Sequence, residues 1–170
     1  MSKEEHKKQA PKQVRCKVIT ISDTRTIETD KSGQLIITLL KEHGHIVNEY
    51  EIVRDEQELI RHSIVKGCEN AEIDVVLCNG GTGVAKRDVT IETIQELIQK
   101  EIPGFGELFR MLSYTEDIGS AAILSRAIAG VALDTAIFST PGSSGAVKLA
   151  MTKLILPELG HVVSEIQKDL

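Results

Sequence analysis

The sequence predicts an α/β fold, a three-layer α/β/α sandwich around a mostly parallel sheet. From residue 14 onward, short apolar segments typical of strands alternate with longer segments of helical periodicity. One short segment, residues 73–78, is almost continuously apolar, as expected of a strand buried on both faces of a parallel sheet. Because crossovers between parallel strands are right-handed, the intervening helices would cover both faces of the sheet.

The first part of the domain is expected to contain strands that are each followed by a helix. Residues 14–22 are rich in β-branched side chains, and residues 46–53 alternate like a second strand. Three segments have helical periodicity and each follows an expected strand: residues 31–43, 55–66 and 90–100. Gly44 stands where a glycine commonly ends a helix.

The second part of the domain is less regular. Pro103 suits the first turn of a helix, whose apolar face would consist of Phe105, Leu108, Phe109 and Leu112. We expect a short helix over residues 120–129, then two strand pieces, 131–133 and 136–139, that form a hairpin around Asp134. The final segment is expected to be a helix interrupted near Pro157.

Length and composition favour one folded domain. The chain has 170 residues, of which 41% are hydrophobic, so a single domain over residues 13–170 can bury a sizeable core. Residues 1–12 are charged and almost without large apolar groups, which predicts a mobile N-terminal tail. A net charge of −5 and an aromatic content of only 3% argue against a nucleic-acid partner.

Targeting signals and cysteine usage point to a cytoplasmic protein. No apolar run reaches membrane-spanning length, and the N-terminal residues lack the apolar core of a signal peptide, so we expect no membrane partner. The cysteines are Cys16, Cys68 and Cys78. Their odd number and wide spacing predict reduced thiols rather than a disulfide framework or a metal finger.

The segment NGGTGVAKRDVT, residues 79–90, lies between an expected strand and an expected helix. The backbone of Gly80–Gly83 can approach a ligand closely, and its N–H groups, the Thr82 hydroxyl and the following helix terminus favour an anion such as phosphate. A tight turn that merely needs glycine is the alternative. The segment is neither a P-loop nor a GxGxxG fingerprint, because Ala85 precedes Lys86 and Lys86 occupies the third glycine position.

A second loop of small residues, STPGSSGA at 139–146, has similar chemistry. Pro141 and Gly142 open it, and Ser143 and Ser144 offer hydroxyl groups at the start of the final helix. Either serine could be an ordinary helix N-cap, and an N-cap serine can also face an incoming phosphate. Together the two loops predict a bipartite site for a phosphorylated small molecule.

Carboxylates accompany these loops. Asp55 and Asp88 each follow a strand, and the carboxyl ends of strands form the ligand-binding edge of an open α/β sheet. Each could instead cap the helix that follows it, Asp55 in a capping box with Glu58. Two carboxylates at this edge could hold Mg²⁺, which takes one or two carboxylates plus substrate phosphates. Asp23 and Glu107 are further candidates.

The histidines predict no catalytic arrangement. His43 and His45 flank Gly44 and could form part of a metal site, but no third ligand is apparent, so we favour a solvated loop. The remaining histidines, at positions 6, 62 and 161, are isolated.

Five segments in the right order resemble the MoaB/MogA molybdopterin-binding family. They are TISDTR (20–25), NGGTGVAKRDVT (79–90), PGFGELFR (103–110), AILSRAIAG (122–130) and TPGSSGAVKLA (140–150). The resemblance spans nearly the whole chain after residue 13, and KLILPELGH (153–161) is more similar to the MoaB branch than to the MogA branch. It implies an open α/β/α fold, a homotrimer or hexamer, and a pocket for molybdopterin, a pterin dithiolene with a terminal phosphate. Contacts with other molybdenum cofactor biosynthesis proteins are also implied.

The resemblance further implies adenylylation of molybdopterin with Mg-ATP before metal insertion. By their motifs, Asp55 and Asp88 would be the magnesium and catalytic carboxylates. Ligand-binding positions would be Asp23, Gly80, Gly81, Thr82, Gly83, Glu107, Pro141, Gly142, Ser143 and Ser144. Ser139 departs from the asparagine that many adenylylating members carry, so a non-catalytic binding or carrier protein is the alternative. The sequence does not distinguish a trimer from a hexamer, nor the use of molybdenum from the use of tungsten.

Overall fold

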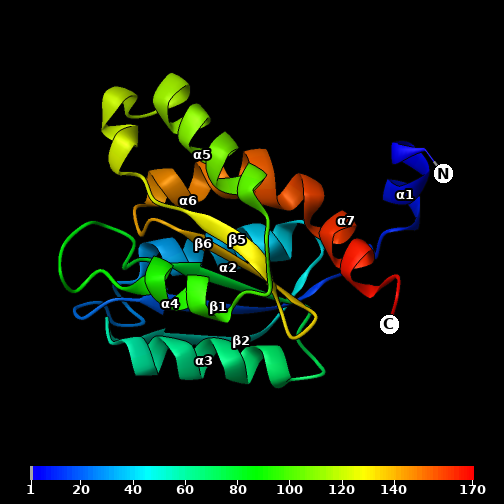
Figure 1. The fold of residues 1–170 in the computed structure, drawn as a ribbon, viewed down its shortest axis with the longest axis horizontal. Coiled ribbons are helices and arrows are strands. Elements are labelled where there is room, and N and C mark those ends of the chain that lie inside the picture. Colours follow the sequence, from blue (N-terminus) through cyan, green and yellow to red (C-terminus); the bar gives the residue numbers. More distant parts are fainter. Residues whose placement is uncertain (1) are drawn as a thin grey trace.

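The computed structural model describes residues 2–170 and contains one six-stranded sheet in the order β2-β1-β3-β6-β5-β4 (Figure 1). Strands β1 (Arg15–Ile21), β2 (Ile46–Val53), β3 (Val75–Asn79) and β6 (Thr135–Thr140) are parallel neighbours. Strand β5 (Ile128–Ala132) pairs antiparallel with β6 and with the two-residue edge strand β4 (Lys100–Glu101). The expected mostly parallel sheet is therefore confirmed.

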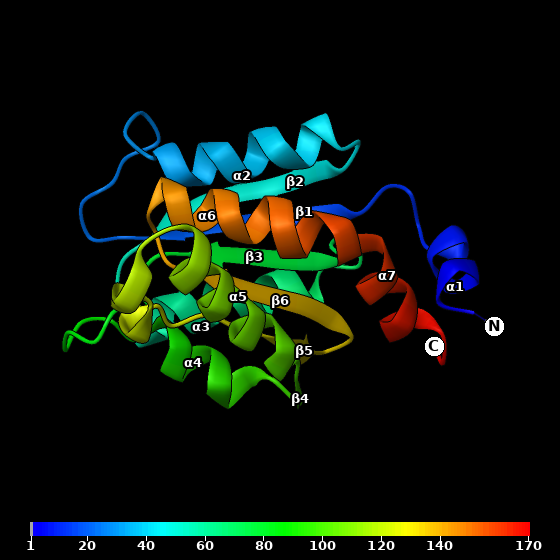
Figure 2. The same cartoon turned by 90° about the horizontal axis from the view of Figure 1, so that it is seen from above.

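Helices cover both faces of this sheet, which makes the three layers (Figures 1 and 2). One face carries α2 (Lys31–Glu42), α5 (Pro103–Glu116), α6 (Ser144–Ala150) and α7 (Leu156–Gln167), whose apolar side chains share one core cluster. The other face carries α3 (Gln57–Glu69) and α4 (Thr90–Leu97) over a second cluster. Alternate residues of β1 enter the two clusters, Val18 the first and Ile19 the second, as strand geometry requires.

The prediction of a helix over residues 120–129 is wrong. A short 3₁₀ helix, η1 (Gly119–Leu124), ends before β5, and Ile128 and Ala129 pair with β6. Gly130 pairs with Glu101 of β4, and an added Cβ atom there would be 2.7 Å from the Lys100 carbonyl oxygen. Sheet pairing thus overrides the local helical pattern. The hairpin around Asp134 is confirmed, with Leu133 and Asp134 at φ values of 49° and 58° in its turn.

The interruption near Pro157 is also confirmed. Between α6 and α7, residues Met151–Ile155 form a π-helical turn, and Pro157 lies in the first turn of α7. Proline lacks the N–H group that a continuous α-helix would need there, and its ring crowds the preceding turn, so the wider turn accommodates it.

The predicted mobile tail contains a short helix, α1 (Lys3–Gln9), which begins at a capping box between Ser2 and Glu5. The helix lies beside α7 (Figure 1). The mobility of residues 1–12 and a domain boundary at residue 13 stay predictions. Within residues 2–170, no helix is long and apolar enough to cross a bilayer.

Candidate functional site

A cavity of about 520 Å³ opens at the carboxyl ends of the parallel strands, the expected edge. It collects residues from the ends of β1, β2, β3 and β6, together with part of η1. Nine of its lining residues were predicted from the sequence to bind a ligand or metal: Asp23, Asp55, Gly80, Gly81, Thr82, Gly83, Asp88, Pro141 and Gly142. Residues far apart in the chain therefore meet on one cavity of the size that small ligands use.

The first glycine loop has a backbone that only glycine tolerates. Gly80 and Gly81 have φ values of +97° and +66°, in the left-handed region. A Cβ atom on Gly80 would lie 2.2 Å from the carbonyl oxygen of Ile21, and one on Gly81 would lie 2.3 Å from Oγ1 of Thr90. The tight-turn and ligand-loop interpretations are thus compatible, because the turn that needs glycine is also the turn that forms the cavity wall.

Neither Asp55 nor Asp88 caps a helix. The N-cap residues of α3 and α4 are Glu56 and Val89, and neither helix has a side-chain cap. Oδ2 of Asp88 instead accepts a hydrogen bond of 3.0 Å from the backbone N–H of Ala85. Asp55 donates its own backbone N–H to Oδ1 of Asp23 at 3.1 Å. The capping alternative is wrong for both residues, and both carboxylates face the cavity.

Negative charge accumulates around Asp55. Burial, reinforced by the charges of Asp23 and Asp88, raises the pKa of the Asp55 carboxyl group above its ordinary value. Asp23 differs, because Arg87 donates to both of its carboxylate oxygens at 2.7 and 3.0 Å and lowers its pKa. A cation would relieve the repulsion at Asp55. Among residues 2–170, no group of three or more His, Cys, Asp or Glu side chains could hold a metal alone, so substrate oxygens would have to complete a magnesium site.

Arg126, which sequence reasoning missed as a site residue, holds the first glycine loop. Its Nε donates to the Thr82 carbonyl at 3.0 Å and its Nη2 to the Gly83 carbonyl at 2.9 Å. Its Nη1 and Nη2 also donate to the two carboxylate oxygens of Glu92 of α4, which lowers the pKa of that carboxyl group. Arg126 belongs to a motif that carried the family resemblance, but no local spacing indicated this contact.

The second glycine loop meets the first. Ser143 is the N-cap of α6, because its Oγ accepts from the Ala146 N–H at 3.2 Å, as predicted. Pro141 and Gly142 line the cavity, whereas Ser143 and Ser144 are exposed and lie outside its lining. A Cβ atom on Gly142 would lie only 3.2 Å from the Cα of Gly80. The two loops are therefore in van der Waals contact, as a bipartite site requires.

Glu107 does not belong to this cavity. It is exposed on α5, and the cavity lining of this chain does not include it. Helical periodicity turns Gly106 and Phe109 inward, which directs Glu107 away from the sheet. The role of Glu107 as a pocket-wall acid therefore stays a prediction, which this single-chain cavity does not support.

The histidine pair is structural. Nδ1 of His45 accepts a hydrogen bond of 3.1 Å from the backbone N–H of Val14, and the Nδ1 of His43 lies 2.8 Å from the Leu39 carbonyl. Both lie at the end of α2, on the edge opposite the cavity.

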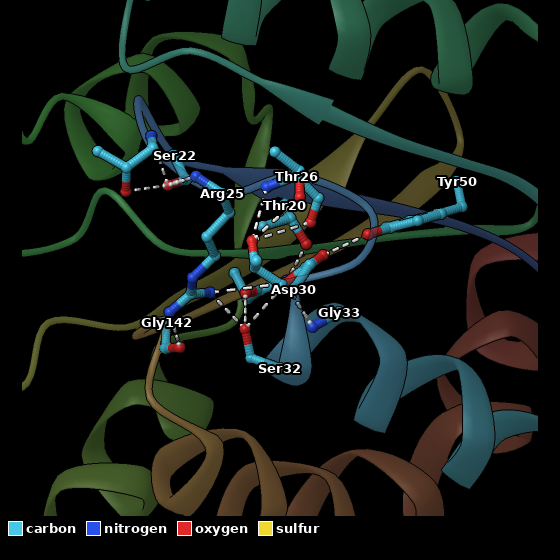
Figure 3. Close-up of polar contacts among 12 residues, drawn as sticks. Thr20, Ser22, Arg25, Thr26, Asp30, Ser32, Gly33, Tyr50 and Gly142 are labelled. Carbon is cyan, nitrogen blue, oxygen red and sulfur yellow. Dashed lines mark hydrogen bonds and ion pairs between the residues drawn. The ribbon is translucent and has the colours of Figure 1, made fainter.

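A polar network that reaches the cavity through Arg25 and Gly142 was also missed (Figure 3). It joins Arg25 of the loop after β1 to Asp30 and Ser32 at the start of α2, and to the Gly142 carbonyl. Polar residues inside strands, Thr20 and Asn79, were the signal that could have revealed it, because buried polar side chains need partners.

Comparison with known proteins decides the family. Residues 17–161 match the family model described as a probable molybdopterin binding domain. The chain belongs to this molybdopterin-binding MoaB/MogA family. It is 68% identical over 169 residues to Molybdenum cofactor biosynthesis protein B of Bacillus subtilis (strain 168), with 99% of each sequence covered.

Two solved structures extend the likeness to the fold. A crystal structure of Molybdenum cofactor biosynthesis protein B is 64% identical and superimposes with a TM-score of 0.91, covering 94% of this chain and 99% of the other. The tungsten cofactor synthesizing protein MoaB from Pyrococcus furiosus is 38% identical, with a TM-score of 0.81 and coverage of 93% and 99%. The resemblance carried by the sequence motifs, including its MoaB character, is confirmed.

Proposed function

We propose that this protein acts in molybdenum cofactor biosynthesis by binding molybdopterin in the cavity and adenylylating it with Mg-ATP. One observation carries the proposal. Two carboxylates that cap no helix, Asp55 and Asp88, face the same cavity as two glycine loops that touch each other. Anion-binding loops beside metal-binding carboxylates suit a reaction between two phosphorylated molecules.

In this proposal, the backbone N–H groups of Gly80–Gly83 and the Thr82 hydroxyl bind substrate phosphate. Asp55 and Asp88 would hold Mg²⁺ together with phosphate oxygens, and the ion supplies charge neutralisation at the reacting phosphate. A phosphate oxygen of molybdopterin forms a new P–O bond to the α-phosphorus of ATP. The bond to the bridging oxygen of the β-phosphate breaks, and pyrophosphate leaves.

The second candidate is a non-catalytic molybdopterin-binding or carrier protein. Ser139, in place of the asparagine of many adenylylating members, favours it. However, Ser139 is fully buried in β6 and does not line the cavity. The departure therefore concerns a buried strand position rather than a cavity-lining residue, which weakens this argument for the carrier.

Pyrophosphate release distinguishes the two candidates. The protein, molybdopterin and Mg-ATP are mixed under anaerobic conditions, and release is compared with reactions that lack molybdopterin or contain excess EDTA. We expect release that needs both molybdopterin and the metal. Binding of molybdopterin without any release would favour the carrier, and absence of binding would contradict both candidates.

We also propose a homo-oligomer, a trimer or a hexamer. The outer surface of α5 and η1 exposes an apolar group of side chains comprising Leu108, Met111, Tyr114, Ile118, Ile123 and Leu124. Several exposed large apolar side chains on neighbouring elements are typical of a protein interface, and Leu124 also lines the cavity. Multi-angle light scattering should report a trimer or a hexamer, and a monomer at micromolar concentration would contradict the proposal.

A further inference from the structure

The loop that follows β1 reaches the second glycine loop through one side chain. Nη2 of Arg25 donates a hydrogen bond of 2.7 Å to the carbonyl oxygen of Gly142. The same guanidinium donates through Nη1 to Oγ of Ser32. Figure 3 shows the Arg25 side chain extended between these partners. Arg25 therefore ties the second loop to the start of α2.

Asp30 holds the other end of this connection. Its carboxylate is fully buried, and such a group is stable only with several partners. It accepts from the backbone N–H of Gly33 at 3.0 Å and from the Tyr50 hydroxyl, and Nη1 of Arg25 lies 3.6 Å from its Oδ1. The guanidinium thus lies beside a buried negative charge, which it also reaches through Ser32, whose Oγ lies 3.4 Å from Oδ1 of Asp30.

The network is also hydrogen-bonded to side chains of the sheet. Oγ of Ser32 donates to Oδ1 of Asn79 at 2.7 Å, and Nδ2 of Asn79 donates to Oγ1 of Thr20 at 2.9 Å. Thr20 and Asn79 are neighbours in register on β1 and β3. Because Thr20 and Asn79 are buried and paired in the sheet, this anchoring helps to fix the place of Arg25 and, through it, of Gly142.

The connection acts on the cavity because of where Gly142 lies. Gly142 packs against Gly80, and Arg25 is itself a lining residue whose side chain is 32% exposed. A shift of Gly142 would open the contact between the two glycine loops. The planar fork of arginine can donate to a carbonyl and to the Ser32–Asp30 pair at once, which a lysine ammonium on its flexible stem cannot reproduce.

We propose that Arg25 is a positioning residue, oriented by Asp30, that holds the Pro141–Gly142 loop against Gly80 in the geometry that binds the phosphorylated end of molybdopterin. The inference rests on the proposed function for the identity of the ligand. It does not rest on that function for the position of the loop, which can be measured without ligand.

Arg25→Lys tests the proposal, with Arg15→Lys as a matched control. Arg15 donates to both oxygens of Asp74 at 3.1 and 2.9 Å, at the opposite end of β1. We expect Arg25→Lys to weaken molybdopterin binding about tenfold in an anaerobic titration, the scale of one charge-assisted hydrogen bond. The KM for molybdopterin should rise while the KM for ATP and the Tm stay unchanged. Arg15→Lys should change affinity less than about twofold.

Amide hydrogen exchange of the free protein supplies an independent readout. Peptides covering residues 141–147 should exchange faster in Arg25→Lys than in the wild type or in Arg15→Lys. Wild-type exchange and wild-type affinity in Arg25→Lys would overturn the proposal. If the wild type itself binds no molybdopterin, the proposed function fails, and the exchange rates still decide the positioning role.

The role of Asp30 is tested by Asp30→Asn, which is expected to weaken binding in the same direction and to speed exchange of the same peptides. Should Asp30→Asn fail to fold, Tyr50→Phe removes one hydrogen bond to the same carboxylate. Its expected effect is a smaller change of the same kind. A folded variant with unchanged affinity and exchange would overturn the orienting role of Asp30.

Discussion

The two glycine loops of the cavity have similar compositions, but different forces hold them in place. The first loop depends on its own backbone as well as on Arg126, since Gly80 and Gly81 adopt positive φ values and leave no room for a side chain. The second loop does not have positive φ at Gly142, and a Cβ atom there would meet its neighbours at 3.2 Å or more. It depends instead on Arg25, which lies 117 residues away in sequence.

Each loop is bound at its backbone carbonyl groups by a different arginine, Arg126 for the first loop and Arg25 for the second. The acids paired with these two arginines differ in how deeply they are buried. Arg126 pairs with Glu92, whose side chain is 49% exposed, whereas Arg25 is oriented by Asp30, whose side chain is 0% exposed. Water and salt screen an exposed pair far more than a buried one. Glycine in the sequence therefore indicates two loops, but only the surroundings of each show which substitutions it tolerates.

The largest expected effect concerns the acid beside the first loop. Asp88→Asn removes the charge proposed to hold Mg²⁺ while keeping size and the ability to accept from Ala85. Turnover should fall by about two orders of magnitude or more, the scale of losing one preorganised electrostatic contact, with an unchanged Tm. Pyrophosphate release and thermal unfolding measure the two quantities.

Asp134→Asn, in the turn between β5 and β6, is the control for that change. Asn adopts positive φ readily, so both activity and stability should be retained there. Full activity in Asp88→Asn would remove Asp88 from the proposed chemistry, and a parallel loss of stability would indicate a structural role.

Alanine substitution at one glycine of each loop compares their backbones directly. Gly80→Ala should lower the free energy of unfolding by about 2–4 kcal/mol, because its Cβ would meet the Ile21 backbone and its φ is unfavourable for alanine. Gly142→Ala should cost less than about 1 kcal/mol, since only modest shifts are needed. Urea unfolding of both variants tests this, and equal costs would contradict the contrast drawn between the loops.

A pH-dependent effect is expected at Asp55. The folded-state pKa of this acid lies above its unfolded value, so the native state holds the proton more tightly. Its contribution to stability is therefore present at low pH and is lost as pH rises from the unfolded pKa through the folded one. Asp55→Asn carries no charge at any pH and so avoids this loss of stability. Without ligand or metal, the variant should therefore have a higher Tm than the wild type at pH 7, and its activity should be lower.

The difference in Tm between Asp55→Asn and the wild type should shrink as the pH falls below the ordinary carboxyl pKa. Glu42→Gln, an exposed acid at the end of α2 and outside the cavity lining, serves as the control and should leave both Tm and activity near the wild-type values. A Tm gain that is the same at every pH would contradict the electrostatic explanation.

The smallest expected effect is at Glu92. Glu92→Gln keeps a hydrogen-bond acceptor for Arg126 and removes an exposed charge pair, so the free energy of unfolding should change by less than about 1 kcal/mol. A loss greater than that of Gly142→Ala would show that the exposed pair holds the first loop more firmly than its exposure suggests.

Much of the fold could be predicted from local patterns. The order of strands and helices, the turn at Asp134 and the interruption at Pro157 follow from periodicity and from the backbone limits of proline and turn residues. The cavity edge was equally predictable, because Asp55, Gly80 and Asp88 follow strands whose carboxyl ends must meet in a parallel sheet. These features depend on residues close in sequence, or on one general property of the sheet.

Only the tertiary structure decided the remaining features. Residues 128–129 became a strand because β6 was available to pair with them, although their local pattern suggested a helix. Asp55 and Asp88 looked like helix caps, but their hydrogen bonds go elsewhere. Glu107 lies on the exposed side of α5, outside the cavity lining of the chain.

The sequence by itself determined which parts this protein contains. They are alternating strands and helices, two glycine loops, and two acids at the carboxyl edge of the sheet. Its tertiary structure decided which long side chains hold those loops. Arg25 reaches Gly142 and Arg126 reaches Thr82 only because the sheet order places β1, β3 and β6 side by side. Such contacts depend on the direction of a flexible side chain across a large sequence separation, and no local periodicity or turn preference encodes that direction.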